Sequence, residues 1–286
     1  MPELPEVQTV VDHLAEKIKG RVFSDCQVKV KKMAGPDFKN KIKNFKIKTV
    51  KRRAKMIIIE SIDDKYLIIH LKMTGQLVFV DKKGKAAGGG HPIKSEEFDI
   101  TKPNKFTRII LNFEDGSLLL FHDVRKFGWM RIVNNDQWTK INNQFGIEPL
   151  SRKFTLKKFE EILQKRPNLK IKQLLMMQEL IAGIGNIYAD ESLFEAKISP
   201  LRQAKSLKSA EVKKLYQSII KKLKEAIKLG GTSVNTFVSS SGERGRFAGK
   251  LKVYKRAGQK CLRCKSILKK TKIGGRGTVY CLKCQE

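Results

Sequence analysis

The chain has 286 residues, with 60 Lys and Arg against 28 Asp and Glu, and a formal net charge of +32 at pH 7. Its hydrophobic content of 41% suits a folded core, and no apolar run of about eighteen residues predicts a membrane span. The charge favours nucleic acid as a partner, although ribosomal RNA or a membrane surface would also explain it. The length predicts about two domains. Because the N-terminus lacks the pattern of a secretory signal, we expect a cytosolic protein.

The first segment of the chain predicts an amphipathic helix over residues 3–19. Its apolar residues recur at steps of three and four, which is the period of one helix face. They are Leu4, Val7, Val10, Val11, Leu14 and Ile18. Pro5 is compatible with this helix because an amide in the first turn has no helical partner to lose. Gly20 is expected to end it.

Pro2 and Glu3 allow a second interpretation of the same stretch. A methionine before a small residue is normally removed, and this leaves the secondary amine of Pro2 as the first group. An α-amine has a pKa near 7.7–8.0, so at neutral pH it can attack a carbon such as a sugar C1′ and form an iminium. Glu3 would then supply or accept a proton. A plain helix start, with Glu6 complementing the helix dipole, stays open as the alternative.

Residues 21–133 predict a strand-rich sandwich or barrel that carries the N-terminal helix. Apolar, β-branched runs are separated by turn signals such as Asp63-Asp64 and Asp115-Gly116. These runs read KMIIIE, YLIIHLKMTGQLVFV, FTRIILNFEDGSLLLF and GWMRIV. Residues 82–97 show no periodicity, so we expect a long flexible loop there.

A boundary marked by Gly and Pro at 145–154 precedes a small all-α domain. Helical periodicity is present over residues 155–165, 170–179, 186–196 and 207–229. The Gly- and Ser-rich stretch 229–249 predicts a loop or linker. The remaining tail is too short to form a stable core without a cross-link such as disulfides or a bound metal ion.

The tail contains two Cys-x2-Cys pairs that can supply such a cross-link. Cys261 and Cys264 form the first pair, Cys281 and Cys284 the second, and the segment between them suits a β-hairpin. In a cytosolic chain this spacing favours one structural zinc ion over two disulfides. Cys26 is left over, and a lone cysteine of this kind is expected in the core.

Three further motifs are candidates for binding, and each also has a structural interpretation. The run GIGN ends at Asn186 before a predicted helix, where amides can bind a phosphate or the Asn side chain can cap the helix. Met73 and Phe127, near turns, suit a core or a wedge in a base stack, and Arg125 could occupy the space of an extruded base. Arg276 lies beside glycines in the zinc hairpin, where a guanidinium can approach a phosphate or simply be solvated.

Together these pieces resemble the formamidopyrimidine-DNA glycosylase family, the bacterial base-excision enzymes for oxidised purines. The matching motifs occur in the family's order from end to end. They are PELPEVQTV, RRAK (52–55), HLKMTG (70–75), DVRKFG (123–128), GIEPL, GIGNIYADESLF, GGT (230–232) and GGRGTVYCLKCQ. The resemblance implies an α+β multidomain fold: a β-sandwich with an N-terminal helix (1–134), an all-α helix–two-turn–helix domain with a lesion-recognition loop (135–249), and a zinc-ribbon β-hairpin (250–286).

The resemblance also implies an activity and the residues that perform it. Pro2 would attack C1′ of the damaged nucleotide while Glu3 protonates the sugar oxygen, and the iminium would permit β- and then δ-elimination with Lys55 and Arg276 as acids. Met73, Arg125 and Phe127 match residues that fill the void of a flipped base, and a loop within 232–249 would close on that base. The candidate DNA-binding residues are His70, Met73, Arg108, Arg125, Lys126, Phe127, Arg166 and Asn186. The partner would be double-stranded DNA with oxidised bases, bound by a cytoplasmic, nucleoid-associated bacterial monomer with no cofactor but zinc.

Two departures from the family pattern stand out. The segment KFTR (105–108) replaces the family's KHDH, so a histidine contact to phosphate is lost and Arg108 is expected to substitute for it. Lys72 stands where many members have Gly.

Leu4 favours the purine branch over the related pyrimidine-preferring enzymes, which typically begin PEGPE. The alternatives are a pyrimidine-preferring glycosylase of the same fold and a non-catalytic, zinc-containing nucleic-acid-binding protein.

Overall fold

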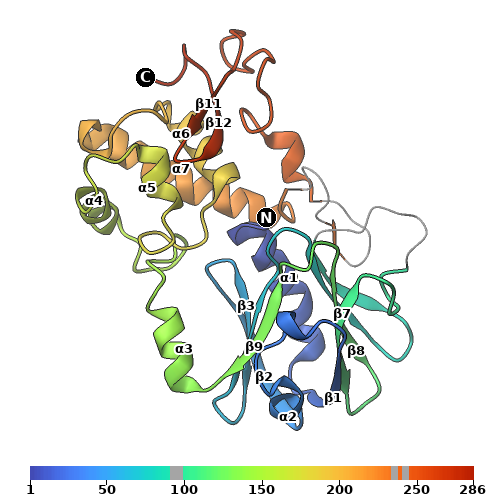
Figure 1. Ribbon diagram of the computed structural model, residues 1–286. Coiled ribbons are helices and arrows are strands. Elements are labelled where there is room, and N and C mark those ends of the chain that lie inside the picture. Colours follow the sequence, from blue (N-terminus) through green and yellow to red (C-terminus); the bar gives the residue numbers. More distant parts are fainter. Residues whose placement is uncertain (91–98, 233–237, 240–244) are drawn as a thin grey trace. The chain divides into compact units, whose positions relative to one another are not determined.

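The computed structural model describes residues 1–90, 99–232, 238–239 and 245–286 (Figure 1). The chain forms two compact units, one of residues 1–143 with 229–248 and one of residues 144–228 with 249–286. This grouping differs from the expected division after residues 134 and 249, because residues 135–143 and 229–248 belong to the first unit. Arg53 Nε donates to Asn142 Oδ1 at 2.5 Å, which attaches the helix that follows the sandwich to this unit. The expected lesion-recognition loop lies largely outside the described residues.

The chain begins with helix α1 (Leu4–Ile18), as expected. Glu3 is the residue before the helix, Pro5 lies in the first turn, and Lys19 ends it one residue before Gly20. The apolar face is buried: Val7, Val10, Leu14 and Ile18 are each 0% exposed. The helix packs against β2, β3, β5 and β6.

A ten-stranded antiparallel sheet forms the body of the first unit, within the described residues. Its strand order is β10-β6-β5-β8-β7-β1-β2-β3-β4-β9. The strands are β1 (Val22–Val28), β2 (Phe45–Arg53), β3 (Met56–Ser61), β4 (Tyr66–His70), β5 (Gly75–Val80), β6 (Ala86–Gly90), β7 (Thr107–Phe113), β8 (Leu118–Asp123), β9 (Trp129–Val133) and β10 (Val238–Ser239).

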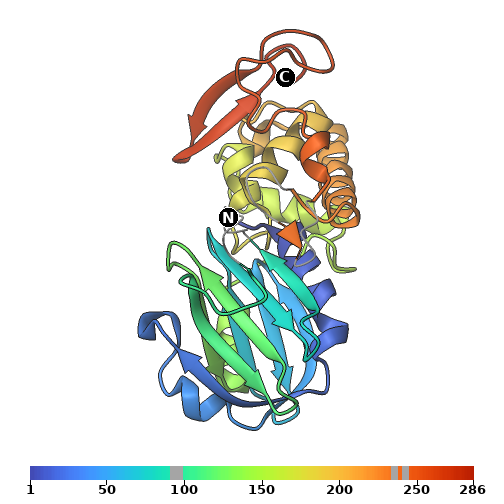
Figure 2. The same cartoon turned by 90° about the vertical axis from the view of Figure 1, so that its right-hand side faces the viewer.

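The sheet folds over into the two layers of a β-sandwich, as expected. β2, β3, β4 and β9 make one layer, and the layer that contains β7 and β8 faces the viewer in Figure 2. Side chains from α1 and from both layers meet in one core, which includes Phe23, Ile57, Leu77 and Phe121. Cys26 belongs to this core and is 4% exposed, so its expected place in the core is confirmed.

The prediction of a loop over residues 82–97 is wrong for residues 86–90. Residues Ala86–Gly90 form β6, which pairs with β5 and β10; residues 91–97 lie outside the described part of the chain. The strand has no alternating pattern because its three last residues are glycines. A Cβ on Gly88 would lie 2.2 Å from the Leu77 carbonyl oxygen, so this backbone approaches its neighbour too closely for a side chain.

The second unit combines helices with the cysteine-bearing hairpin. The helices are α4 (Leu156–Gln164), α5 (Ile171–Met176), α6 (Asn186–Ala196) and α7 (Ser209–Lys228), close to the four expected ranges. β11 (Lys269–Ile273) and β12 (Arg276–Tyr280) form the expected hairpin. Short elements that the sequence patterns did not predict are η1 (Lys31–Met33), α2 (Phe38–Ile42), α3 (Asn135–Asn142), η2 (Ala204–Ser206) and η3 (Phe247–Lys250). Among the described residues, no helix is both long and apolar enough to cross a bilayer.

Candidate functional site

The start of α1 holds Pro2 and Glu3 in a fixed, buried position. Pro2 is buried and Glu3 is 4% exposed. Glu3 and Glu6 form a capping box, in which the Glu3 backbone N–H donates to Glu6 Oε2 at 2.9 Å. Glu3 has extended backbone angles (φ −102°, ψ −171°), so Pro2 lies outside the helical turn. Helix capping and an available first residue are therefore compatible, and the two interpretations of this stretch do not exclude each other.

Glu6 also connects this start to a distant part of the same unit. Its Oε1 accepts the Thr232 backbone N–H at 2.8 Å and the Thr232 hydroxyl at 2.9 Å. Glu6 is 2% exposed and Thr232 is 5% exposed. A Cβ on Gly231, whose φ is +79°, would lie 3.1 Å from Glu6 Cγ, so glycine permits both the turn and the close approach. No sequence pattern indicated this connection, because the two residues are 226 positions apart.

Lys55 lies in the two-residue turn between β2 and β3. It is 7% exposed and follows Ala54, whose φ is +53°. Burial, together with the charges of Lys72 and Lys55, lowers the pKa of His70 to about 3. The Nδ1 atom of His70 accepts the Lys72 backbone N–H at 2.9 Å. His70 is thus neutral at pH 7 with its proton on Nε2, which leaves that atom as a neutral hydrogen-bond donor.

Two loops of the first unit present the expected void-filling residues. Met73 and Phe127 are 40% and 52% exposed, and the Arg125 guanidinium carbon lies 4.6 Å from the Phe127 ring centre. Both loops are attached to Asp123, which is 0% exposed. Its carboxylate accepts the Thr74 hydroxyl, the Arg125 backbone N–H at 3.1 Å and the Gly128 backbone N–H at 2.7 Å. The exposed side chains of Met73 and Phe127 therefore project from loops that are fixed by hydrogen bonds to a buried carboxylate.

Arg108 is placed beneath this pair of loops. It is 9% exposed, and it donates from Nε to the Asp123 carbonyl at 2.7 Å and from Nη1 to the Lys105 carbonyl at 3.0 Å. Burial lowers the pKa of its guanidinium. The structure gives Arg108 a supporting position under the 123–128 loop, and its contact with a phosphate stays a prediction.

The second unit brings Asn186 next to the hairpin that carries Arg276. Gly274 and Gly275 form the hairpin turn with φ of +53° and +76°, as a type I′ turn requires, and Arg276 follows as an exposed residue. Asn186 is the first residue of α6 and its Nδ2 donates to the Gly277 carbonyl at 3.0 Å. The helix cap is Gly185, so the interpretation of Asn186 as the cap is wrong.

A buried ion pair strengthens this junction. Lys172 Nζ lies 2.8 Å from Asp190 Oδ1, and each side chain is 1% exposed. The same ammonium donates to the Gly277 carbonyl at 3.0 Å and to the Thr278 hydroxyl at 2.7 Å. Sequence reasoning missed these residues; the only signal was an Asp on a predicted helix that proves to be buried. Arg166, by contrast, is exposed just beyond α4.

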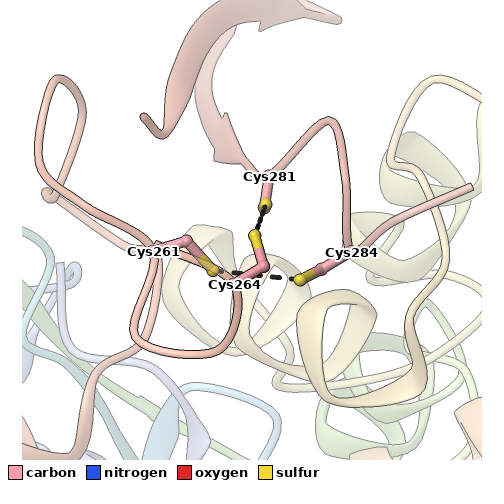
Figure 3. A group of neighbouring side chains, drawn as sticks. All are labelled: Cys261, Cys264, Cys281 and Cys284. Carbon is pink, nitrogen blue, oxygen red and sulfur yellow. Dashed lines mark hydrogen bonds between the residues drawn. The ribbon is translucent and has the colours of Figure 1, made fainter. Parts of the chain in front are cut away.

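The four tail cysteines converge in the arrangement of a tetrahedral metal site (Figure 3). All four Sγ atoms lie within 4.8 Å of one another, with Cys264 and Cys281 at 3.4 Å and Cys261 and Cys284 at 3.9 Å. A tetrahedral zinc with bonds of about 2.3 Å needs sulfur atoms about 3.8 Å apart, so these residues fit the ion. The site packs against Phe194 of α6 and Val253.

Family models match nearly the whole chain. The formamidopyrimidine-DNA glycosylase N-terminal domain matches residues 1–130, the H2TH domain of the same enzymes matches 145–238, and a zinc finger found in FPG and IleRS matches 258–286. That last match covers all four cysteines, so the chain holds one structural zinc ion.

Curated relatives and solved structures agree with the family models. The formamidopyrimidine-DNA glycosylases of Halalkalibacterium halodurans and Listeria innocua are 39% and 37% identical, with 100% of each chain covered. A complex of Lactococcus lactis Fpg with DNA that contains an abasic site is 34% identical, with a TM-score of 0.84 over 99% of each chain. A complex of MutM with DNA that contains carbocyclic 8-oxo-G is 35% identical, with a TM-score of 0.83 over 100% of each chain.

Proposed function

The chain belongs to the formamidopyrimidine-DNA glycosylase family and is a DNA glycosylase of base excision repair; we propose that it excises oxidised purines through an imine formed by the amine of Pro2. The observation that carries this proposal is the start of α1. There a buried Pro2 precedes Glu3, the N-cap residue of the helix, and lies outside the helical turn. The substrates we propose are 8-oxoguanine and formamidopyrimidines in duplex DNA.

The reaction begins once Met1 is absent and the Pro2 nitrogen carries a free electron pair. This pair attacks C1′ of the damaged nucleotide, the bond from C1′ to the base breaks, and the base leaves with the bonding electrons. The Glu3 carboxylate takes the proton from the attached Pro2 nitrogen and passes it to the sugar oxygen, so the ring opens and the nitrogen electron pair forms an iminium with C1′. The departed base takes up a proton from water. A base within a duplex must first be flipped out, and an oxidised base unstacks more easily.

Strand cleavage follows from the same iminium. It acidifies the neighbouring carbon, so that loss of a proton there expels the 3′ phosphate by β-elimination, and a second elimination expels the 5′ phosphate. We assign Lys55, buried in the same unit as Pro2, to the first step and Arg276, exposed in the zinc hairpin, to the second. Zinc supplies no reacting group in this scheme, since a closed four-thiolate site has no open position; it holds the hairpin.

The remaining candidates divide between filling the void and holding the backbone. Met73, Arg125 and Phe127 would occupy the position of the flipped base, and their attachment to Asp123 gives them the rigidity that this requires. We assign phosphate contacts to His70, Arg108, Lys126, Arg166 and Asn186. We further propose that the protein acts as a monomer in a bacterial cytoplasm. A dimer in sedimentation analysis would overturn the first part of that statement.

Borohydride trapping tests the proposal. Purified protein is incubated with duplexes that contain 8-oxoguanine, a formamidopyrimidine, an oxidised pyrimidine or no lesion, after mass spectrometry has confirmed Pro2 as the first residue. We expect a reduced covalent adduct with both oxidised purines and none with the intact duplex. A stronger adduct with the oxidised pyrimidine would reassign the substrate class. Absence of any adduct would contradict the enzymatic proposal and leave a zinc-containing DNA-binding protein.

A further inference from the structure

A basic pocket with an aromatic wall opens beside the void-filling loops of the first unit. Its volume is about 460 Å³. Met73 and Phe127 line one side, and Trp129 of β9 lines the wall. The cationic residues around it are Lys32, Lys72, Lys126 and Arg131. Of the described residues that line it, none is acidic, so the pocket favours an anionic occupant.

Two of these lysines are held in a strained backbone conformation. Lys72 has φ of +50° and Lys126 has φ of +57°, in the left-handed region that non-glycine residues rarely occupy. The Lys72 backbone is held by its hydrogen bond to His70, and the loop of Lys126 is held on both sides by Asp123. Strain of this kind persists where the surroundings impose it, and it concentrates at ligand-binding loops.

Trp129 is suited to stack on a nucleobase. It is partly exposed, the Arg131 guanidinium carbon lies 5.0 Å from its ring centre, and the His70 ring centre lies 5.8 Å away. A base that stacks on an aromatic side chain strengthens single-strand binding for any of the four bases, because each has a π face. The cations next to the ring supply the positive charge that binds a phosphodiester. The pocket thus offers both contacts that one nucleotide requires.

We propose that this pocket binds a nucleotide of the undamaged strand, with its base against Trp129 and its phosphate between Lys32 and Arg131. The inference rests on the proposed function, in which Met73 and Phe127 enter the space of the flipped base. The base left without a partner must then face those two side chains. A pocket that they line is therefore reached first by the strand opposite the lesion.

Trp129 provides a direct readout, since the chain has only two tryptophans. In a Trp138→Phe background Trp129 is the only tryptophan, and phenylalanine keeps an aromatic ring on Tyr66, whose ring centre lies 5.5 Å away. The probes are duplexes with a tetrahydrofuran abasic analogue in one strand. The opposite strand is intact, or lacks the bases facing the lesion and its two neighbours.

We expect the saturating intact duplex to quench Trp129 fluorescence and the base-deficient opposite strand to lose at least half of that quenching. Equal quenching by both duplexes, or none at saturation, would overturn the proposal.

A charge comparison supplies the second measurement. Lys32→Gln with Arg131→Gln removes two charges from the pocket, whereas Lys83→Gln with Lys85→Gln removes two exposed charges from the β5–β6 turn outside it. We expect the pocket pair to weaken binding of the lesion duplex at least tenfold more than the control pair, with no such difference on the damaged single strand. Equal losses in the two pairs would refute the pocket. Trapping by the wild-type protein is measured in parallel, so failure of the proposed function is recognised separately.

Discussion

Replacing Glu6 with glutamine removes an acceptor from a buried carboxylate that joins two parts of the first unit. The carboxylate accepts the Glu3 backbone N–H at 2.9 Å, the Thr232 backbone N–H at 2.8 Å and the Thr232 hydroxyl at 2.9 Å. A carboxamide has the same shape but only one oxygen. Its amide nitrogen must therefore face a donor, and the least costly choice places it against Glu3 and keeps the oxygen on Thr232.

The expected cost follows from these contacts. A buried N–H left without a partner costs about 1–3 kcal/mol. The two bonds to Thr232 lose their charge assistance, which about halves their strength and adds about 1 kcal/mol. We therefore expect the free energy of unfolding to fall by about 3 kcal/mol. Thr232→Val removes only the hydroxyl donor and should cost about 1 kcal/mol. The double variant should cost less than the sum, because both changes act on one contact.

Urea unfolding of the zinc-loaded full chain measures these free energies, and single-turnover kinetics measure the effect on catalysis. Glu6 holds the backbone of Glu3, whose proposed task is protonation of the sugar during base release. At a preformed abasic site the base is already lost, and the sugar opens to its aldehyde without help from Glu3. We therefore expect Glu6→Gln to slow base excision on the order of tenfold while abasic-site cleavage changes less than about threefold. Unchanged unfolding and unchanged excision would refute the role that we give Glu6.

Three further predictions concern other parts of the molecule. Burial lowers the pKa of His122 to about 4; since the unfolded residue takes up its proton near pH 6.5, His122 should lower stability by about 1.4 kcal/mol per unit as pH drops from 6 to 4. His70 adds a similar slope, so His122→Gln should remove about half of their joint slope in urea titrations. Lys172→Met should destabilise by about 3–5 kcal/mol because it leaves the Asp190 carboxylate buried without its cation, and adding Asp190→Leu should recover much of the loss. Cys264→Ser should lower bound zinc well below one per chain by elemental analysis; full retention would contradict the four-thiolate site.

The helices show which sequence signals are sufficient to predict the position of a helix. The apolar period of 3.6 residues placed α1 within a residue of each end, because one face of it is buried in the core. It also placed α6 correctly. Helix α3 was missed because none of its residues is buried, so no apolar period exists. Its stability comes from a capping box between Asn134 and Gln137, which periodicity does not detect.

The strand β6 was missed for a related reason. Its pairing depends on backbone contacts that only glycines allow, and glycines carry no pattern of burial. A run of glycines between two apolar strands indicates a loop or a closely packed strand equally well, and only the neighbouring backbone decides between them.

In the candidate site, the sequence indicated the reactive and metal-binding residues better than the residues that hold them in position. The secondary amine of Pro2 beside an acid, and the cysteine spacing, are local features with a direct chemical meaning. The contact between Glu6 and Thr232 and the pair of Lys172 with Asp190 join distant segments, so local patterns did not predict them. The hydrogen bonds from Arg108 to the carbonyls of Asp123 and Lys105 were likewise not predicted, and its contact with a phosphate stays a prediction.

Identification of the residue that carries the trapped DNA tests the central claim most directly. The borohydride-reduced adduct with an 8-oxoguanine duplex is digested with nuclease and protease, and the modified peptide is sequenced by mass spectrometry. The account predicts the remnant of the sugar on the nitrogen of Pro2, and loss of the adduct at that position when Met1 is retained. A remnant on Lys55 or on another lysine, with Pro2 unmodified, would contradict it.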